Sequence, residues 1–291
     1  MFDAVLLSDL HIGSEFCQAR AVLDFLDQLP ETNRLVLLGD VLEKTEHHLT
    51  KQHWRILSRL RKISDRMEVI WVIGNHDADA ESVAHLIGAD FVTEFQFESG
   101  GKRLLCVHGD AWDSFWRDHP IVTNIVDWLY VNLKRLSRRL ARRAKLNSRT
   151  FLQCIERVRR GAVEYARAKQ ADLVICGHTH LAEAKRASSA DSPIYFNTGC
   201  WTDHTCHYLT VQHGLLDLHE FHPDDAAGCR PSRARLPRAG GYPGRPASPF
   251  VPAEAARRDS AGPAEPGLED PLASGQETPP GGRDRPQPVC R

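Results

Sequence analysis

Residues 35–43 read Leu-Val-Leu-Leu-Gly-Asp-Val-Leu-Glu, and this stretch carries the pattern that decides the fold. The apolar run from Leu35 to Leu38 has the length and composition of a buried strand. A flexible glycine and then an acidic residue, Asp40, follow it directly. Polar residues placed just after successive strands of an α/β sheet lie together at its carboxyl edge. The stretch therefore predicts a strand that delivers a carboxylate to a site at the edge of a sheet.

The same pattern occurs at four other places in the first 180 residues. The other expected strands are Ala4–Leu7, Val69–Ile73, Leu104–Val107 and Leu173–Cys176. The polar clusters that follow them are Asp9-Leu10-His11, Gly74-Asn75-His76-Asp77, His108-Gly109-Asp110 and Gly177-His178-Thr179-His180. Carboxylate oxygens, imidazole nitrogens and amide oxygens are donors that divalent metals take in proteins. One such cluster would mean little, but five that each follow a strand predict a two-metal hydrolase.

Periodicity and composition divide the chain into three parts. Residues 1–110 alternate expected strands with short helices, as βαβ units require. Helices are expected at Ala19–Gln28, Lys51–Ile63 and Ala80–Leu86, and later strands at Ile194–Asn197, Tyr208–Val211 and Leu215–Phe221. We interpret residues 1–222 as a catalytic domain of the α/β class, with a basic helical insertion at 112–169 that ends in a helix at Phe151–Lys169. Residues 223–291, rich in Pro, Gly, Ala and Arg, are expected to be a disordered tail.

The composition gives no bias toward nucleic acid or membranes as a whole, with 37 basic and 38 acidic residues among 291. No apolar run approaches the ~18 residues that a bilayer span needs. No charged-then-apolar leader precedes Phe2–Leu7. The eight cysteines form no CxxC pair, which favours a reducing compartment. We therefore expect a cytoplasmic protein without a transmembrane segment.

Taken in order, the motifs DxH, GDxx(D/E), GNHD, HGD and GHTH resemble those of the calcineurin-like metallophosphoesterase superfamily. The resemblance covers about residues 1–222, and it implies a four-layer α/β/β/α sandwich with a helical lid. It also implies a dinuclear metal site, with Mn²⁺ as the expected metal and Fe²⁺, Zn²⁺ or Ni²⁺ as alternatives. By matching position, one metal would take Asp9, His11, Asp40 and His180, and the other would take Asp40, Asn75, His108 and His178.

The resemblance gives His76 the role of general acid toward the leaving oxygen. A carboxylate three residues after the shared aspartate orients that histidine in the family, and here the position is Glu43, where Asp is more usual. The nucleophile would be a hydroxide formed from water that the cations acidify.

The insertion and the stretch Tyr195–Trp201 are similar to those of the UDP-2,3-diacylglucosamine pyrophosphatase-like branch, which acts in lipid A synthesis. That similarity implies an anionic, lipid-linked substrate beneath a lid of inserted helices. The insertion is strongly basic, and its basic residues are Lys134, Arg135, Arg138, Arg139, Arg142, Arg143, Lys145 and Arg149. We expect substrate contacts from Arg138, Arg139, Arg142 and Trp201, and peripheral contact of this segment with the inner membrane surface.

Three alternatives remain at this point. The best-defined enzymes of that branch carry Arg where this chain has His76, which leaves a soluble nucleotide phosphodiesterase or phosphatase open. A protein of a different class, which binds or processes nucleic acid through the Arg-rich insertion, would show steeply salt-dependent binding. The basic residues could also form only a solvated face on a helical hairpin. The Arg-rich half lacks interleaved aromatic residues, which disfavours nucleic acid as the partner.

Overall fold

A computed structural model describes residues 1–43, 49–113, 147–186, 192–203, 205–221 and 230–231, together with Arg135, Ser137, Leu140 and Ala144. The chain separates into two units, Met1–Arg245 and Pro246–Arg291, and all described residues belong to the first unit. Half of the insertion, including residues 114–134, and all of the expected tail except residues 230–231 therefore lie outside the described residues. Arg230–Pro231, within the expected tail, form a short strand, β12, that pairs with the sheet.

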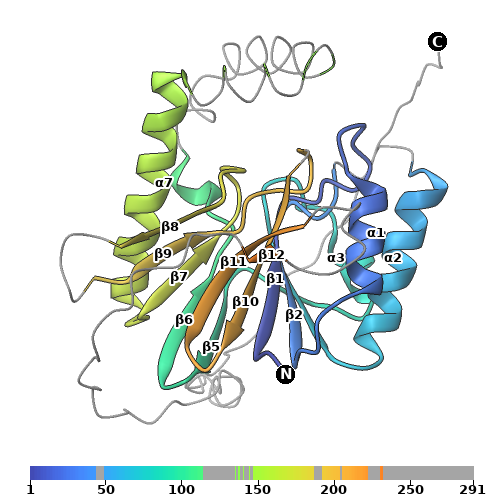
Figure 1. Cartoon of the computed structure of the whole chain (residues 1–291), viewed down its shortest axis with the longest axis horizontal. Helices are drawn as coiled ribbons and strands as arrows, with labels where there is room; N and C mark the ends of the chain where they lie inside the picture. The colour runs from blue at the N-terminus through green and yellow to red at the C-terminus, as the bar shows by residue number, and fades with distance from the viewer. Residues whose placement is uncertain are drawn as a thin grey trace, which may run out of the picture. The chain divides into compact units, whose positions relative to one another are not determined.

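Two sheets form the centre of the first unit (Figure 1). The first sheet has the order β12-β11-β10-β1-β2-β3-β4, and its β1 to β4 run parallel. Its strands are β1 Ala4–Leu7, β2 Arg34–Leu38, β3 Glu68–Val72, β4 Asp90–Val92, β10 Cys206–Gln212, β11 Leu215–Phe221 and β12. The second has the order β5-β6-β7-β9-β8, with β6, β7 and β9 parallel. Its strands are β5 Phe95–Ser99, β6 Lys102–Cys106, β7 Leu173–Cys176, β8 Glu183–Arg186 and β9 Ile194–Asn197.

The helices occupy the outer faces of the two sheets. They are α1 Ala19–Asp27, α2 Lys51–Ser64, α3 Glu81–Leu86 and α7 Arg149–Ala168, with a 3₁₀ turn, η1, at Asp110–Trp112. Helix α2 begins with a capping box, in which the Thr50 side chain accepts from the His53 N–H and the His53 ring accepts from the Thr50 N–H. In Figure 1, α1 and α2 lie on one side of the sheets and α7 on the other.

The alternation of side chains along the strands creates three apolar interfaces. Val5 of β1 belongs to the cluster shared with α1, α2 and α3, whereas its neighbour Leu6 belongs to the cluster between the two sheets. In the same way Leu104 of β6 faces the other sheet, and Leu105 faces α7. Successive residues of a strand point to opposite faces, so each buried strand contributes to two layers. The α/β class is confirmed, and the layers follow the order helices, sheet, sheet, helix.

The structure adds strands that the sequence pattern did not predict. Strands β4 and β8 are short, and β8 reads Glu-Ala-Lys-Arg, which has no apolar run. Strand β5 lies at the edge of the second sheet and is only partly buried. The strands that precede the polar clusters fall in both sheets, with β1, β2 and β3 in one and β6 and β7 in the other. Within the described part of the chain, no helix is both long enough and apolar enough to cross a bilayer.

An aromatic cluster holds α1 against the first sheet. The Phe25 ring lies 5.2 Å from that of Trp201, 4.7 Å from that of Tyr208 and 5.4 Å from that of Phe221, measured between centroids. We predict that Phe25→Ala lowers the free energy of unfolding by about 3–5 kcal/mol, because it leaves a cavity among large rings. Urea denaturation of the full chain measures this change.

The matched control is Trp54→Ala on α2, where the aromatic side chain is 61% exposed. That change should stay within about 0.5 kcal/mol of wild type, as is usual for surface substitutions. Equal losses in the two variants would contradict the assignment of Phe25 to the core.

Candidate metal centre

Backbone hydrogen bonds bring the loops after the motif-bearing strands together. The Asp9 N–H donates to the Gly39 carbonyl at 3.0 Å, which joins the loops after β1 and β2. The His178 N–H donates to Asp9 Oδ2 at 3.0 Å, which joins the loop after β7 in the other sheet. The Gly177 N–H likewise donates to the His108 carbonyl at 3.0 Å. The carboxyl edges of both sheets therefore meet at one place.

The backbone at this place is strained. Five of the expected ligand residues have positive φ: Asp9 at 53°, His11 at 47°, Asp40 at 50°, His178 at 66° and His180 at 59°. Residues with a side chain rarely adopt this left-handed conformation, and such strain concentrates at functional sites. Among the described residues, Gln170 and His213 are the other non-glycine examples. The fold thus holds these five side chains in unusual directions, all toward the same centre.

Two glycines allow the loops to approach so closely. A Cβ atom at Gly39, where φ is +79°, would overlap the imidazole of His108. A Cβ atom at Gly74 would overlap the backbone nitrogen and the carboxylate of Asp40. Any larger residue at either position would push a candidate ligand out of place. This explains why glycine precedes the polar residue in the second and third clusters.

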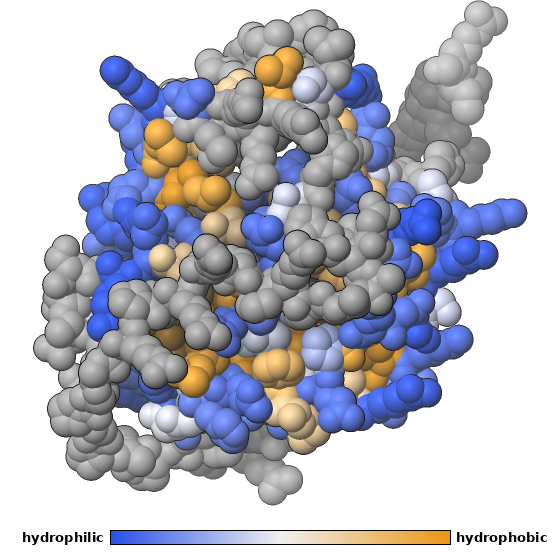
Figure 2. Space-filling model, in the orientation of Figure 1, coloured by the Kyte–Doolittle hydropathy of each residue, from blue (hydrophilic) through white to orange (hydrophobic). Residues whose placement is uncertain are grey.

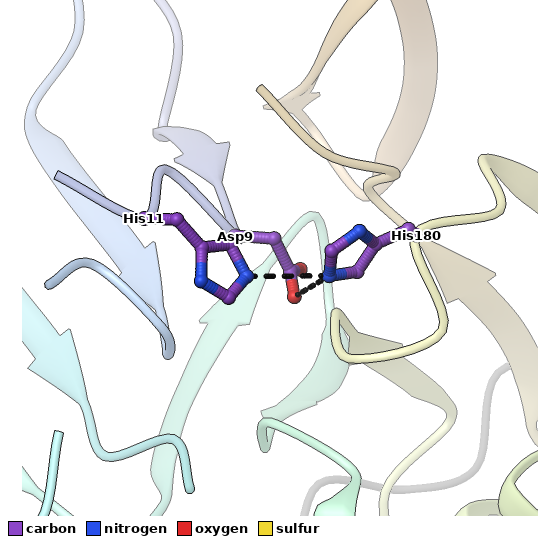
Figure 3. A group of neighbouring side chains, drawn as sticks. All are labelled: Asp9, His11 and His180. Atoms are coloured by element: carbon purple, nitrogen blue, oxygen red, sulfur yellow. Dashed lines mark hydrogen bonds and ion pairs between the residues drawn. The ribbon is translucent and has the colours of Figure 1, made fainter. Parts of the chain in front are cut away.

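Asp9, His11 and His180 form a first group of donor atoms (Figure 3). The Nε2 atom of His180 lies 3.1 Å from Asp9 Oδ1 and 3.3 Å from Nε2 of His11. Asp9 and His11 come from the loop after β1, and His180 comes from the loop after β7. Each sheet therefore supplies part of this group.

Asp40, His108 and His178 form a second group. The His108 ring donates from Nδ1 to the Leu38 carbonyl at 2.8 Å, which turns its Nε2 toward Asp40 Oδ2 at 3.4 Å. Asn75 lies beside this group, with its Oδ1 atom 3.1 Å from Nδ1 of His178. The structure thus brings together all seven residues that the sequence indicated as ligands, although their binding of metal stays a prediction.

Asp40 lies between the two groups through a single oxygen. Its Oδ2 atom is 3.8 Å from Nε2 of His11 and 3.4 Å from Nε2 of His108. Its Oδ1 atom accepts a hydrogen bond from the His76 N–H at 2.9 Å. The arrangement suits a carboxylate that bridges two cations through Oδ2, with the second oxygen held by the backbone.

The donor atoms fit divalent cations. Within each group they lie within 4.8 Å of one another, and they are carboxylate oxygens and imidazole nitrogens. The buried atoms Asp9 Oδ1 and His108 Nε2 face other candidate ligand atoms, His180 Nε2 at 3.1 Å and Asp40 Oδ2 at 3.4 Å. Metal ligands gather donor atoms around one point in this way, so the arrangement fits a cation between them.

Charges within the site keep its carboxylates ionised. Burial alone would raise the pKa of Asp40, but the facing His108, with His11 and His76, outweighs burial and lowers it. Burial would lower the pKa of His108, yet the charge and hydrogen bond of Asp40 raise it to about 10. The site therefore gathers positive charge opposite its carboxylates, and a divalent cation can take the place of the histidine protons.

Glu43 contacts two histidines at once. Its Oε2 atom lies 2.9 Å from Nδ1 of His11, and its Oε1 atom lies 3.2 Å from Nδ1 of His76. The longer glutamate side chain therefore reaches His76, as expected, and also holds a candidate ligand. Burial would lower the pKa of His76, but the hydrogen bond to Glu43 and the charge of Asp40 raise it. The pKa of Glu43, which burial would raise, is lowered by its hydrogen bonds with both rings.

Two residues outside the expected site support it. Asp77, which is fully buried, accepts from the Leu42 and Gly74 N–H groups at 3.1 Å each and from Trp71 Nε1 at 3.0 Å. It therefore ties the loop after β2 to the loop after β3. Asp113 contacts His178. Asp77 belongs to a motif, but Asp113 lies beyond one, and no spacing rule links it to a partner 65 residues away.

Of the four residues expected to contact the substrate, the structure describes only Trp201. Arg138, Arg139 and Arg142 lie outside the described residues. The Trp201 side chain has no exposed surface, and its ring packs against Phe25 and Phe221. In this structure it is a core residue and not a surface on which a base could stack. Its backbone N–H donates to the Asp9 carbonyl at 3.0 Å, so it supports the site indirectly.

Comparison with known proteins gives a family match. A family model described as calcineurin-like phosphoesterase matches residues 3–182. No curated protein matches the chain. Yfce, a phosphoesterase from E. coli, is 16% identical with a TM-score of 0.43, over 78% of this chain and 98% of that one. Wild-type Vps29 complexed with Zn²⁺ from Entamoeba histolytica is 16% identical with a TM-score of 0.41, over 78% of this chain and 96% of that one.

We predict that Asp40→Asn weakens the binding of both cations, because one Asp40 oxygen faces both donor groups. Elemental analysis of protein dialysed against Mn²⁺ should find fewer than two ions per chain, against two in wild type. Asp217→Asn, an exposed aspartate on β11, is the matched control. Two tightly bound ions in Asp40→Asn would refute the bridging position.

Proposed function

Because the chain belongs to the calcineurin-like phosphoesterase family, we propose that it hydrolyses a pyrophosphate or phosphoester bond in an anionic, lipid-linked substrate. Metal-dependent hydrolysis of a phosphoester is the activity that the family itself supports. The best specific candidate is a UDP-2,3-diacylglucosamine diphosphatase-like reaction, as in lipid A biosynthesis.

The two donor groups would each hold one divalent cation. Asp9, His11, Asp40 and His180 would bind the first, and Asp40, Asn75, His108 and His178 would bind the second. When bound, such a pair neutralises phosphoryl oxygens and acidifies a water molecule. Mn²⁺ is the proposed metal, since mixed oxygen and nitrogen donors suit it, and the same donors accept Fe²⁺, Zn²⁺ or Ni²⁺.

His76 is placed to act as the general acid. Its Nδ1 atom is held by Glu43, which leaves the proton on Nε2 available to the leaving oxygen. The His76 side chain is 28% exposed, so a substrate can reach it, whereas that of His108 is almost fully buried. Burial would lower the pKa of His76, but the hydrogen bond to Glu43 and the charge of Asp40 raise it.

The position of one insertion residue carries the substrate proposal. Arg135 donates from Nη2 and Nε to Glu15 Oε1, at 2.6 and 3.0 Å. Glu15 lies four residues after His11, in the loop that follows β1. A basic residue of the insertion therefore contacts the loop that carries Asp9 and His11. This contact supports a role for the insertion in binding an anionic substrate.

Exposed apolar residues occur on α7 and on the insertion, where exposed basic residues also occur. Leu152, near the start of α7, is 47% exposed, and Leu140 of the insertion is 51% exposed. Figure 2 shows hydrophobic surface over α7, and further hydrophobic patches lower on the same face. Arg149 begins α7 and is exposed. Cationic and apolar residues on the same segments support a substrate with a phosphate and acyl chains, and peripheral contact with a membrane surface.

The nature of the acid favours a second candidate, a nucleotide phosphodiesterase. His76 paired with Glu43 can protonate a poorer leaving group than an arginine could at neutral pH. Such an enzyme would need no acyl chains on its substrate. Assays with UDP-2,3-diacylglucosamine and with bis-p-nitrophenyl phosphate, each with Mn²⁺, separate the two. Turnover of the small diester alone would favour the second candidate.

We predict that Arg135→Ala lowers kcat/KM for UDP-2,3-diacylglucosamine about tenfold or more, the usual effect of losing a charged hydrogen bond. Turnover of bis-p-nitrophenyl phosphate should stay near wild type, since that substrate does not need the insertion. Arg61→Ala, an exposed arginine at the end of α2, is the control. An equal loss on both substrates would contradict the role given to the insertion.

We predict that His76→Ala slows turnover by ~10²-fold or more, within the range for general acid–base groups. The variant should still bind two cations, because His76 belongs to neither proposed ligand set, although with His11 and Glu43 it forms a third group of donor atoms. Activity assays and elemental analysis of the same preparation measure the turnover rate and the number of bound ions. Loss of metal from this variant would show that His76 is a ligand and not the acid.

A further inference from the structure

Asp113 is a buried carboxylate outside the five motifs. It follows the η1 turn, and the residue is only 8% exposed. Its Oδ2 atom lies 2.9 Å from Nε2 of His178, on the loop after β7. A carboxylate placed this close to one nitrogen of a candidate ligand affects how the ring can bind a cation.

The contact decides which His178 nitrogen carries the proton. An ionised carboxylate only accepts, so Nε2 must donate to it. In the neutral ring the lone pair is then on Nδ1, which lies 3.1 Å from Oδ1 of Asn75, the residue beside the second donor group. The nitrogen that faces the proposed cation is therefore the one left without a proton.

Two other histidines of the centre are held in the same manner. His11 is held at Nδ1 by Glu43, and its Nε2 faces the first group. His108 is held at Nδ1 by the Leu38 carbonyl, and its Nε2 faces Asp40. In each case an oxygen binds the nitrogen that points away from the donor group. Such outer partners fix the orientation of metal-binding histidines and raise their basicity.

The position of Asp113 depends on how its neighbour packs. The Trp112 ring lies against Gly161 of α7, where a Cβ atom would overlap it, and 5.8 Å from the Tyr165 ring. The Asp113 N–H donates to the Asp110 carbonyl at 3.0 Å, which completes the turn. Trp112 therefore anchors η1 on α7, and the turn aims Asp113 at His178.

We propose that Asp113 is a positioning residue for the second cation: it holds His178 so that Nδ1 faces that cation, and Trp112 packed on Gly161 holds Asp113. This inference rests on the proposed ligand role of His178. It links α7, the helix that ends the insertion, to the metal centre through one turn and one hydrogen bond.

The proposal is tested by titrating Mn²⁺ into metal-free full-length protein and measuring the heat of binding by calorimetry. Asp113→Ala should bind one of two ions about 10- to 100-fold more weakly, as is usual when an outer partner is lost, and should keep the other near wild type. Asp113→Asn should bind that ion with an affinity between those of wild type and Asp113→Ala, because the amide oxygen still accepts from Nε2 of His178. Electron paramagnetic resonance should show the coupled signal of a Mn²⁺ pair in wild type and mainly single ions in Asp113→Ala.

The control is Asp172→Ala, which removes an aspartate at the opposite end of β7 that accepts from the Arg103 N–H. It should bind both ions as wild type does. Gly161→Ala should weaken the same ion as Asp113→Ala, because it displaces Trp112, although Gly161 lies in neither donor group. If Asp113→Ala does not fold, as judged by circular dichroism, Asp113→Asn decides the question.

Wild-type protein that binds fewer than two ions would contradict the proposed function, before any variant is considered. Wild-type protein that binds two ions, with Asp113→Ala binding both equally well and showing the coupled signal, would overturn the role of Asp113 alone. Equal weakening in Asp172→Ala would also overturn it, since the effect would then be a general loss of stability.

Discussion

The Asp40 carboxylate lies where the loops of both sheets meet, and much of the site is arranged around its charge. A buried carboxylate is costly unless it is paired and hydrogen-bonded. Here the His76 N–H donates to Oδ1, while His11 and His108 face Oδ2. The strained backbone at Asp40 and at its neighbours is maintained because hydrogen bonds between loops, such as His11 N–H to the Asp40 carbonyl, hold it. The charge of Asp40 must therefore be neutralised, and the histidines that the loops of both sheets bring to it, together with the proposed cations, do so.

The packing of the two sheets is what makes that arrangement possible. Leu6 and Leu38 of the first sheet and Leu104 and Ile175 of the second belong to one buried cluster between them. The donors follow the same division, since Asp9, His11 and Asp40 come from one sheet and His108, His178 and His180 from the other. Neither sheet alone completes either donor group. Binding of metal would therefore stabilise the packing of the sheets, and the packing would in turn create the site.

The sequence predicted most of the fold and the candidate ligands, because each signal is local. An apolar run followed by glycine and a polar residue needs only a few neighbouring positions to be recognised, and Leu35–Asp40 is the clearest example. Strand β8 was missed because its residues are polar and its pairing with β9 is set by tertiary contacts. Trp201 was assigned to the substrate because a buried aromatic and a stacking platform look alike in sequence. Asp113 carries no local signal, since its partner is far along the chain.

The polar clusters expected to carry out the reaction and the insertion expected to select the substrate are less separate in the structure than in the sequence. The clusters after the strands were expected to account for the reaction, and the insertion was expected to account for the substrate. The structure shows that the two share a boundary, because η1 follows the fourth cluster directly and packs on α7 through Trp112. Arg135 of the insertion also bonds Glu15, four residues after His11 in the loop that follows β1. The described part of the insertion therefore contacts residues of both donor groups or their loops, because Asp113 lies beside His178 and Arg135 bonds the loop that carries Asp9 and His11.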